Sequence, residues 1–291
     1  MSAIFRKFYK RTAIALMLTG LLSAAEARRI VSTAPSATEM IFALGLGERV
    51  VGVTTYCNYP PEARKITKVA TYIKPDIERI LVVRPDLVVI PKTPLHTRAP
   101  YDAVKLNVLE VKYDSIADIY HSISAIAAAG GVPERGKALS ASIEKQLDAV
   151  KQSVKALKPT SVMFVVGRTP NSLDGLVAVG KTSYLTEVIE LAGGRNIFSD
   201  ASNAYPKISR EEILTRNPEV ILDMGDMSET SGVTEQHKRS VVALWGQYAP
   251  LRAVQSGRVH AIASDIFVVP GPRVVELARQ LARLLHPEAI H

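Results

Sequence analysis

"IERILVVRPDLVVI", residues 77–90, has a counterpart later in the chain, "REEILTRNPEVILD", residues 210–223. Each copy predicts a short helix, a proline beyond its end and a buried strand behind it. At a constant offset of 133 residues, Glu78 matches Glu211 and Pro85 matches Pro218. Internal similarity of this kind indicates two lobes built on one plan.

A second pair of matching stretches lies upstream of these copies. "TEMIFALGLGERVVGV" (38–53) precedes the first and "TEVIELAGGRNIFSD" (186–200) precedes the second. Ser36 and Glu39 have capping-box spacing, which predicts a helix that starts there and ends at Gly45. Apolar β-rich runs separate the helical patterns, at 29–33, 49–54, 86–90 and 107–112. Such runs are typical of parallel sheets covered on both faces, so the predicted fold class is α/β with two Rossmann-like lobes.

A long amphipathic segment lies between the two lobes. From Pro133 onward it places apolar residues on one helical face, at 139, 143, 147, 150, 154 and 157. Such a helix would be roughly 35 Å long at about 1.5 Å per residue, and would hold the lobes rigidly. The expected domains are a first α/β lobe over 28–132, an interlobe helix over 133–158 and a second α/β lobe over 159–291.

Residues 1–27 have the pattern of a cleaved secretory signal peptide. Four cations, at 6, 7, 10 and 11, precede an uncharged apolar run over 12–22, and the segment ends in Ala25-Glu26-Ala27. The run is too short to span a bilayer, so a membrane anchor is the less favoured alternative. No Cys follows the run for lipid attachment. We therefore expect cleavage after Ala27 and a protein outside the cytoplasm.

Charge and cysteine content limit the remaining classes. The signal peptide carries four cations and one acid, so its removal lowers the formal net charge from +8 to +5. No basic stripe interleaved with aromatic residues is visible, which argues against nucleic acid as a partner. Cys57 is the only cysteine, so the chain has no internal disulfide and must rely on an apolar core.

One motif suggests a nucleotide site. Residues 175–182, "GLVAVGKT", fit the phosphate-loop pattern G-x-x-x-x-G-K-[ST]. A phosphate loop needs a flexible turn after a strand, whereas Leu176–Val179 is itself expected to be a strand. We therefore expect a strand, a turn and a helix capped by Thr182 or Ser183, as the second lobe's counterpart of 32–47, with Lys181 at most a cation at the cleft edge. A secreted NTPase is not expected.

Four stretches together resemble a known family by their order and spacing. They are "IVSTAPSATEMIFALGLGERVVGVTTYCNYP" (30–60), "ATYIKPDIERILVVRPDLVVI" (70–90), "YPKISREEILTRNPEVIL" (205–222) and "ASDIF…PGPRVVELARQLARLLHPE" (263–288). They resemble the periplasmic solute-binding proteins of ABC importers for metal chelates, most nearly the cobalamin-binding members. The resemblance implies two α/β lobes bridged by one long helix, with the ligand in the cleft between them. It also implies a periplasmic monomer without a catalytic cofactor, whose partners are an inner-membrane permease dimer and its cytoplasmic ATPase.

The resemblance also implies two docking residues. In this family one glutamate on each lobe binds arginines of the membrane subunits, and the matching motifs place these glutamates at Glu78 and Glu211. The internal repeat puts the same two residues at equivalent positions, which a pseudo-symmetric membrane partner would require. An ordinary first-turn glutamate favoured by the helix dipole is the alternative for each. Glu212 is the alternative to Glu211.

The ligand cleft should combine aromatic faces with a few polar anchors, because a corrinoid or porphyrin is a large flat ring with polar arms. By position in the resemblance, the aromatic candidates are Tyr56, Tyr72, Tyr205 and Phe267, and the polar ones are Ser36, Arg168, Asp265 and Arg273. Surface packing of the tyrosines, pairing of Asp265 with Arg273 and a solvated Arg168 are the alternatives. The role of Asn58 is open, because related cobalamin binders may carry an acid at its position. Trp245 and the six histidines show no metal-binding spacing.

The nature of the ligand is the least determined point. Tyr72 stands where haem-binding relatives place an iron-ligating tyrosine and cobalamin binders place a packing aromatic, so a metal ligand is expected only if the ligand is haem. Ferric siderophores are anionic and would need more cations than Arg168 and Arg273. Cobalamin is therefore ranked first, haem second and a ferric siderophore third. A secreted enzyme is the competing class, but the sequence has no G-x-S-x-G or H-E-x-x-H motif, and Cys57 is taken as a bystander.

Overall fold

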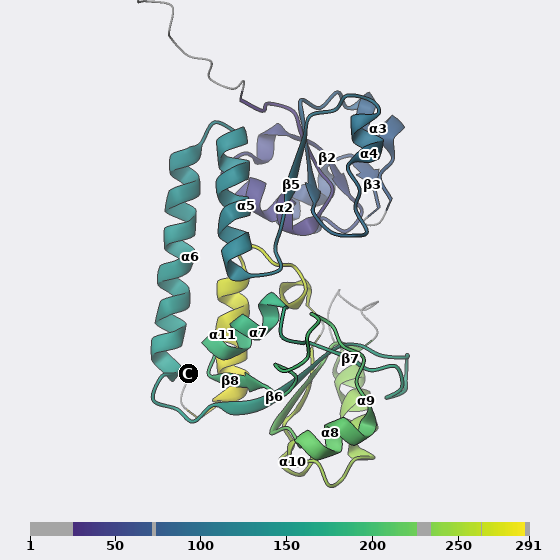
Figure 1. The fold of residues 1–291 in the computed structure, drawn as a ribbon, viewed down its shortest axis with the longest axis vertical. Coiled ribbons are helices and arrows are strands. Elements are labelled where there is room, and N and C mark those ends of the chain that lie inside the picture. The colour runs from purple at the N-terminus through teal and green to yellow at the C-terminus, as the bar shows by residue number, and fades with distance from the viewer. Residues whose placement is uncertain (1–25, 72–73, 226–233, 263, 289–291) are drawn as a thin grey trace, which may run out of the picture.

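The computed structural model describes residues 26–71, 74–225, 234–262 and 264–288, and Figure 1 shows two lobes beside one long helix. The predicted signal peptide lies, except for its last two residues, outside the described residues, as does Tyr72. No helix of the described part is long and apolar enough to cross a membrane.

The first lobe contains a five-stranded sheet in which every pairing is parallel. Its order is β3 (Lys68–Ala70), β2 (Val50–Thr54), β1 (Ile30–Ser32), β4 (Leu87–Pro91) and β5 (Val108–Val111). The helices of this lobe are α2 (Pro35–Ala43), α3 (Ile77–Val82), α4 (Ala99–Asp102) and α5 (Ile116–Ala129). The predicted strands and helices of this half are therefore confirmed, with ends shifted by a few residues.

The second lobe repeats four of these strands in the same order and differs in the fifth. Its sheet runs β10 (Val259–Ala261), β9 (Val220–Asp223), β6 (Thr160–Gly167), and β6 pairs on its other side with both β8 (Gly194–Asn196) and β7 (Val177–Ala178). All pairings are parallel except that of β7, which is antiparallel. Its helices are α7 (Tyr184–Leu191), α8 (Arg210–Arg216), α9 (Glu235–Gly246), α10 (Arg252–Gln255) and α11 (Val274–Leu285).

The strand predicted at 176–179 exists, but its assignment as a counterpart of β1 is wrong. The sheet orders match β1 with β6, β2 with β8, β4 with β9 and β5 with β10. This leaves β3 of the first lobe and β7 of the second lobe without counterparts. The reason is that β7 folds back on the end of β6 before α7 begins. The helix of this prediction is confirmed: α7 follows Ser183, whose hydroxyl accepts from the N–H of Leu185.

Backbone details confirm the duplication. The residues before the two equivalent prolines, Arg84 and Asn217, both have left-handed backbone conformation, with φ of 44° and 43°. The preceding helices are capped at the same position, by Asp76 on α3 and by Ser209 on α8. Non-glycine residues rarely take a left-handed conformation, so its occurrence at both repeat positions supports the internal duplication.

A carboxylate that binds the start of the first strand occurs at equivalent positions in the two lobes. Asp86 accepts hydrogen bonds from the backbone N–H of Arg28 at 2.9 Å, just before β1, and its repeat equivalent Glu219 accepts one from the N–H of Ser161 at 2.8 Å, in β6. Each carboxylate thus fixes the start of the first strand of its own lobe. The two lobes share local chemistry as well as topology.

The capping box predicted for α2 is wrong. The N-cap of α2 is Ala34, whose side chain cannot accept a hydrogen bond, and Pro35 is the first helical residue. Ser36 and Glu39 therefore lie inside the helix, and both are buried. Proline favours the first position because its missing N–H would be unpaired there. Ser36 and Glu39 have the spacing of a capping box, but the N-cap of the helix lies two residues before Ser36.

The long interlobe helix is α6, Pro133–Val154, four residues shorter than predicted at its C-terminal end. The chain leaves the helix before Pro159, which disfavours helical conformation in the residue that precedes it. In Figure 1, α6 runs alongside α5 of the first lobe and α11 of the second. A single apolar cluster joins buried residues of both lobes to those of α6, such as Ile143 and Leu147.

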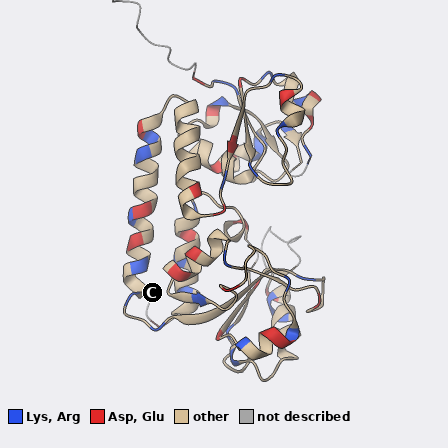
Figure 2. Cartoon of the chain, in the orientation of Figure 1, with Lys and Arg blue, Asp and Glu red and all other residues tan. Residues whose placement is uncertain are grey.

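Figure 2 colours the ribbon by charge, and residues of both signs are interspersed over the described parts of both lobes and along α6. This mixture agrees with the mild net charge deduced from the sequence.

Candidate functional site

The candidate cleft residues follow the carboxyl ends of parallel strands in both lobes. Ser36 follows β1, Tyr56 follows β2, Arg168 follows β6, and Asp265 and Phe267 follow β10. Ligands of open α/β sheets bind outside these strand ends. The fold thus brings residues that are distant in sequence to the corresponding edges of the two sheets.

Three tyrosines present exposed faces at these edges. Tyr56 is 60% exposed and Tyr59 is 41% exposed in the first lobe, and Tyr205 is 49% exposed in the second. The hydroxyl of Tyr205 lies 3.4 Å from that of Ser183, the N-cap of α7. Large exposed aromatic side chains on both lobes suit a flat ring held between them. Tyr59 was not among the residues predicted from the sequence.

Phe267 lies inside the second lobe. It is 3% exposed, and its ring packs edge-on against Phe164 of β6 with 6.0 Å between the ring centroids. Its backbone carbonyl accepts a hydrogen bond from the hydroxyl of buried Tyr184 at 3.3 Å. These contacts favour a role for Phe267 in supporting the cleft edge from beneath.

Arg273 is the centre of an ionic cluster between the lobes. Its Nη1 and Nη2 each lie 3.0 Å from an oxygen of Asp265, so the predicted alternative that these two residues pair is confirmed. Its Nε donates to Glu39 of the first lobe at 2.9 Å, and its Nη2 also bonds to Glu39. The ring of Tyr59 covers the guanidinium, with 4.1 Å from Cζ to the ring centroid.

The charges of this cluster do not balance when all groups are ionised. One guanidinium faces two carboxylates, and Glu39 is 4% exposed. Burial raises the pKa of Glu39 to about 7, although its hydrogen bond and attraction to Arg273 act in the opposite direction. The two carboxylates raise the pKa of Arg273, so the guanidinium stays charged. Burial therefore makes the ionised form of Glu39 costly even beside a guanidinium.

Glu39 was missed as a site residue because its spacing from Ser36 suggested a local helix cap. The useful signal was the repeated Thr-Glu dipeptide, which places Glu39 in register with Glu187. No local pattern points to Arg273 as its partner, since 234 residues separate the two.

Arg168 is buried in the second lobe. Its Nε lies 3.0 Å from Oδ2 of Asp223, and the side chains are 3% and 0% exposed. The indole Nε1 of Trp245 donates to the same oxygen at 2.7 Å. The alternative of a solvated Arg168 is wrong, and the geometry favours a structural role for both Arg168 and Trp245 over direct ligand contact.

The two predicted docking glutamates are exposed at equivalent positions. Glu78 lies in the first turn of α3 and Glu211 in the first turn of α8. Both helices lie on the side of the lobes remote from α6 (Figure 1). Glu212 is engaged in a capping box with Ser209, which lowers its pKa through hydrogen bonds to the charged form. Glu211 carries no such contact among the described residues.

The remaining sequence motifs find structural explanations. The phosphate-loop match contains β7 and an exposed Lys181, with no helix until Tyr184. Cys57 is buried, with Sγ 3.1 Å from the hydroxyl of Thr38. Across the described residues, no group of three or more His, Cys, Asp or Glu is arranged to hold a metal ion.

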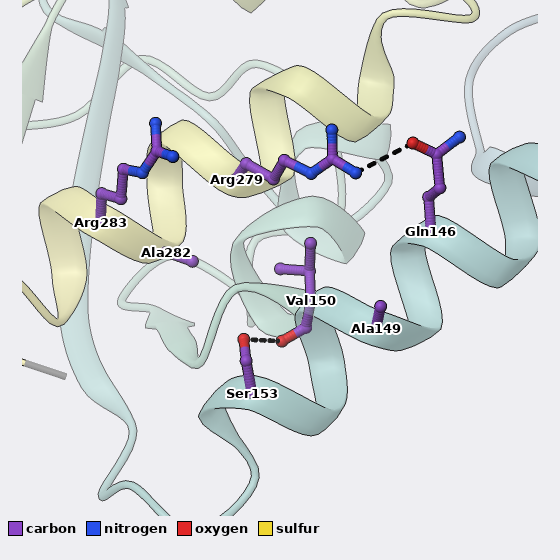
Figure 3. A pocket seen from close by; sticks show the side chains of 7 residues that line it. All are labelled: Gln146, Ala149, Val150, Ser153, Arg279, Ala282 and Arg283. Carbon is purple, nitrogen blue, oxygen red and sulfur yellow. Dashed lines mark hydrogen bonds between the residues drawn. The ribbon is translucent and has the colours of Figure 1, made fainter. Parts of the chain in front are cut away.

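Two surface grooves lie along the helices that join the lobes. One of about 250 Å³ separates α6 from α11, where Arg279 points to Gln146 at 2.9 Å (Figure 3). Another of about 530 Å³ lies among α5, α6 and α7, beside Glu187. Neither groove is lined by Tyr56, Tyr59 or Tyr205, so neither is the expected ligand cleft.

Comparison with known proteins gives consistent results. The model of the family described as periplasmic binding protein matches residues 30–266. A vitamin B12-binding protein of Vibrio cholerae serotype O1 is 28% identical over 262 residues, 89% of each chain. Its crystal structure has a TM-score of 0.74 at 27% identity and covers 90% of this chain and 97% of that one.

Two further proteins are similar to this chain over most of its length. A periplasmic heme-binding protein of Roseiflexus sp. RS-1 has a TM-score of 0.74 at 27% identity, covering 90% of this chain and 99% of that one. An uncharacterized ABC transporter substrate-binding lipoprotein of Bacillus subtilis is 29% identical over 273 residues, 90% of this chain and 81% of the relative.

Proposed function

We propose a function for this chain from one premise: it belongs to the periplasmic binding protein family. It serves as a substrate-binding component of an ABC importer, as its relatives indicate. Beyond this role, we propose that it captures a corrinoid between its lobes and delivers it to an inner-membrane permease dimer with a cytoplasmic ATPase. It would act as a monomer without a catalytic cofactor.

One observation carries the choice of ligand. Exposed tyrosine faces stand at the carboxyl ends of strands in the first lobe and beside them in the second, at Tyr56, Tyr59 and Tyr205. A corrinoid presents a large flat ring that such faces can cover, while its amide arms need polar partners. The vitamin B12-binding relative of Vibrio cholerae supports the same choice.

Haem is the second candidate, favoured by the heme-binding relative of Roseiflexus. It would be held by Tyr72 as a phenolate ligand, a residue outside the described part of the chain. A ferric siderophore is less favoured, because Arg168 and Arg273 are both engaged with carboxylates of the protein itself. A secreted enzyme is disfavoured by the substrate-binding role of the relatives.

We further propose that Glu78 and Glu211 dock the loaded protein onto the importer. Their first-turn positions on α3 and α8 leave both carboxylates exposed on the side of the lobes away from α6. Two equivalent carboxylates on two similar lobes suit a membrane partner with two similar subunits.

We also propose that the chain is exported to the periplasm and that its signal peptide is cleaved after Ala27. The backbone nitrogen of Arg28 lies 2.9 Å from Oδ2 of Asp86. Cleavage at this bond would therefore place the new α-ammonium group beside a carboxylate, which would stabilise the processed end. The intact mass of the exported protein should correspond to residues 28–291, and any other N-terminus contradicts this site.

The ligand is tested by titrating the mature protein separately with cyanocobalamin and haemin, while absorbance and intrinsic fluorescence are recorded. Saturable one-to-one binding of cyanocobalamin, with no Soret shift for haemin, is expected. A Soret band with a phenolate charge-transfer feature that Tyr72→Phe abolishes would replace the corrinoid with haem. Binding of neither compound would remove both proposals.

A further inference from the structure

Glu39 of the first lobe is bound by Arg273 of the second lobe. It projects from α2 of the first lobe, while Arg273 immediately precedes α11 of the second. The Nε and Nη2 atoms of Arg273 both bond to its carboxylate, and the side chains are 3% and 10% exposed. Two parallel bonds to a buried carboxylate fix both distance and orientation.

Glu187 makes the reciprocal contact. It projects from α7 of the second lobe, and its Oε2 accepts a hydrogen bond at 3.1 Å from the backbone N–H of Ile116. Ile116 is the first residue of α5 in the first lobe. A carboxylate at this position satisfies a helix N-terminal donor and is stabilised by the helix dipole.

These two contacts are related by the internal repeat. The dipeptides Thr38-Glu39 and Thr186-Glu187 match in the sequence. Both threonines are buried, and both hydroxyls donate to an upstream carbonyl, of Ala34 at 3.1 Å and of Gly180 at 2.7 Å. Each threonine therefore anchors the turn from which the following glutamate reaches across.

The targets of the two glutamates are also equivalent. Each is the N-terminal end of the last helix of the opposite lobe, α11 for Glu39 and α5 for Glu187. In Figure 1, α5 lies end to end with α11 at the junction of the lobes. Much of the remaining junction among the described residues is apolar packing, which is not directional and tolerates sliding, whereas hydrogen bonds have strict geometry.

We propose that Glu39 and Glu187 are a pseudo-symmetric pair of interlobe latches that set the separation of the lobes and so position the ligand-binding tyrosines. The effect on ligand rests on the proposed function, but the effect on lobe separation does not. A purely structural role would lower stability when either glutamate is replaced and leave the lobe separation unchanged.

The latch is tested by measuring the distance between spin labels in ligand-free protein. Val82→Cys on α3 and Leu214→Cys on α8 provide one exposed label in each lobe, while native Cys57 is fully buried. Glu39→Gln and Glu187→Gln, singly and together, are expected to broaden the distance distribution and shift it to longer values. Controls of the same kind are Glu134→Gln on α6 and Glu190→Gln on α7, both exposed.

A second arm measures cyanocobalamin affinity. If the latches hold the binding-competent separation, the double variant should raise the dissociation constant about 10-fold, since only a fraction of molecules would remain competent. If the wild type binds no cobalamin, the proposed ligand fails while the distance arm still decides the latch.

Unchanged distance distributions in folded Glu39→Gln and Glu187→Gln protein would overturn the proposal, even if thermal stability fell. Should Glu39→Gln fail to fold, the less buried Glu187→Gln and the conservative Arg273→Lys provide the same test. Both are expected to shift the distances, and an unchanged distribution in both would be decisive against the latch.

Discussion

Arg168 and Asp223 form an ion pair inside the second lobe, with side chains 3% and 0% exposed. Removing one partner leaves the other charge buried, so Arg168→Met should lower the free energy of unfolding by about 3–5 kcal/mol. The matched control is Arg210→Met, which removes an ion pair to Asp174 whose side chains are 55% and 64% exposed.

The control should cost far less, because exposed ion pairs contribute little. Urea denaturation of the two variants provides the comparison. Equal losses in the free energy of unfolding would show that the buried Arg168–Asp223 pair matters no more for stability than the exposed pair.

Stability should depend on pH through Glu39. Burial raises its pKa to about 7 in the folded protein from 4.5, so between these values the folded state binds more protons than the unfolded state. The free energy of unfolding should therefore fall as pH rises from about 4.5 to 7, by an amount on the order of 3 kcal/mol from this group. The groups that face Glu39 are Arg273, Asp265, Glu276 and Tyr184.

Glu39→Gln removes this titration, so the difference between wild type and variant should change across the window and become constant above it. Urea midpoints at pH 5, 6, 7 and 8 measure the effect. Glu134→Gln, which removes an exposed acid on α6 that does not face Glu39, should keep the wild-type slope. A parallel pH profile for Glu39→Gln would contradict the assignment.

The docking glutamates should affect delivery without affecting capture. Glu78→Ala combined with Glu211→Ala is expected to leave ligand affinity within about twofold and to impair uptake by the reconstituted importer, because both carboxylates are exposed in the first turns of α3 and α8. Glu134→Ala on α6 removes an exposed acid remote from both helices and serves as the control. Loss of ligand affinity in the double variant would place these glutamates in the cleft instead.

The tyrosine faces should contribute through their rings. Tyr205→Ala removes an aromatic face and is expected to weaken ligand binding by about 10-fold, given about 1–3 kcal/mol for a stacked ring. Tyr205→Phe keeps the ring and loses the hydroxyl, including its contact with Ser183, so affinity should stay close to that of the wild type if the ring carries the binding. Isothermal titration separates the two, and similar losses in both variants would assign the role to the hydroxyl.

The architecture could be predicted because it depends on patterns that the sequence repeats. The copies at 77–90 and 210–223 contain a helix, a proline and a strand, and the structure adds that Arg84 and Asn217 share a left-handed backbone. The extra strand β7 was placed correctly but matched with the wrong element, because strand direction is set by pairing with β6 and not by local sequence.

The ionic contacts were harder to predict, because they join residues that no local pattern connects. Glu39 had the spacing of a helix cap, and only the start of α2 at Pro35 shows that this role is not fulfilled. Arg168 follows a strand end, as a ligand-binding cation would, but its partner Asp223 lies 55 residues away. Partner choice across such separations follows from packing, which the sequence does not display.

The apolar cluster that passes from one lobe through α6 to the other has a thermodynamic consequence. Each lobe has a buried cluster of its own, but the cluster shared through α6 belongs to both, since removing either lobe would expose the buried face of α6 that contains Ile143 and Leu147. Heat or urea should therefore unfold the protein in a single cooperative transition, and neither half expressed alone should be stable. We therefore expect the two lobes to unfold together as one cooperative unit.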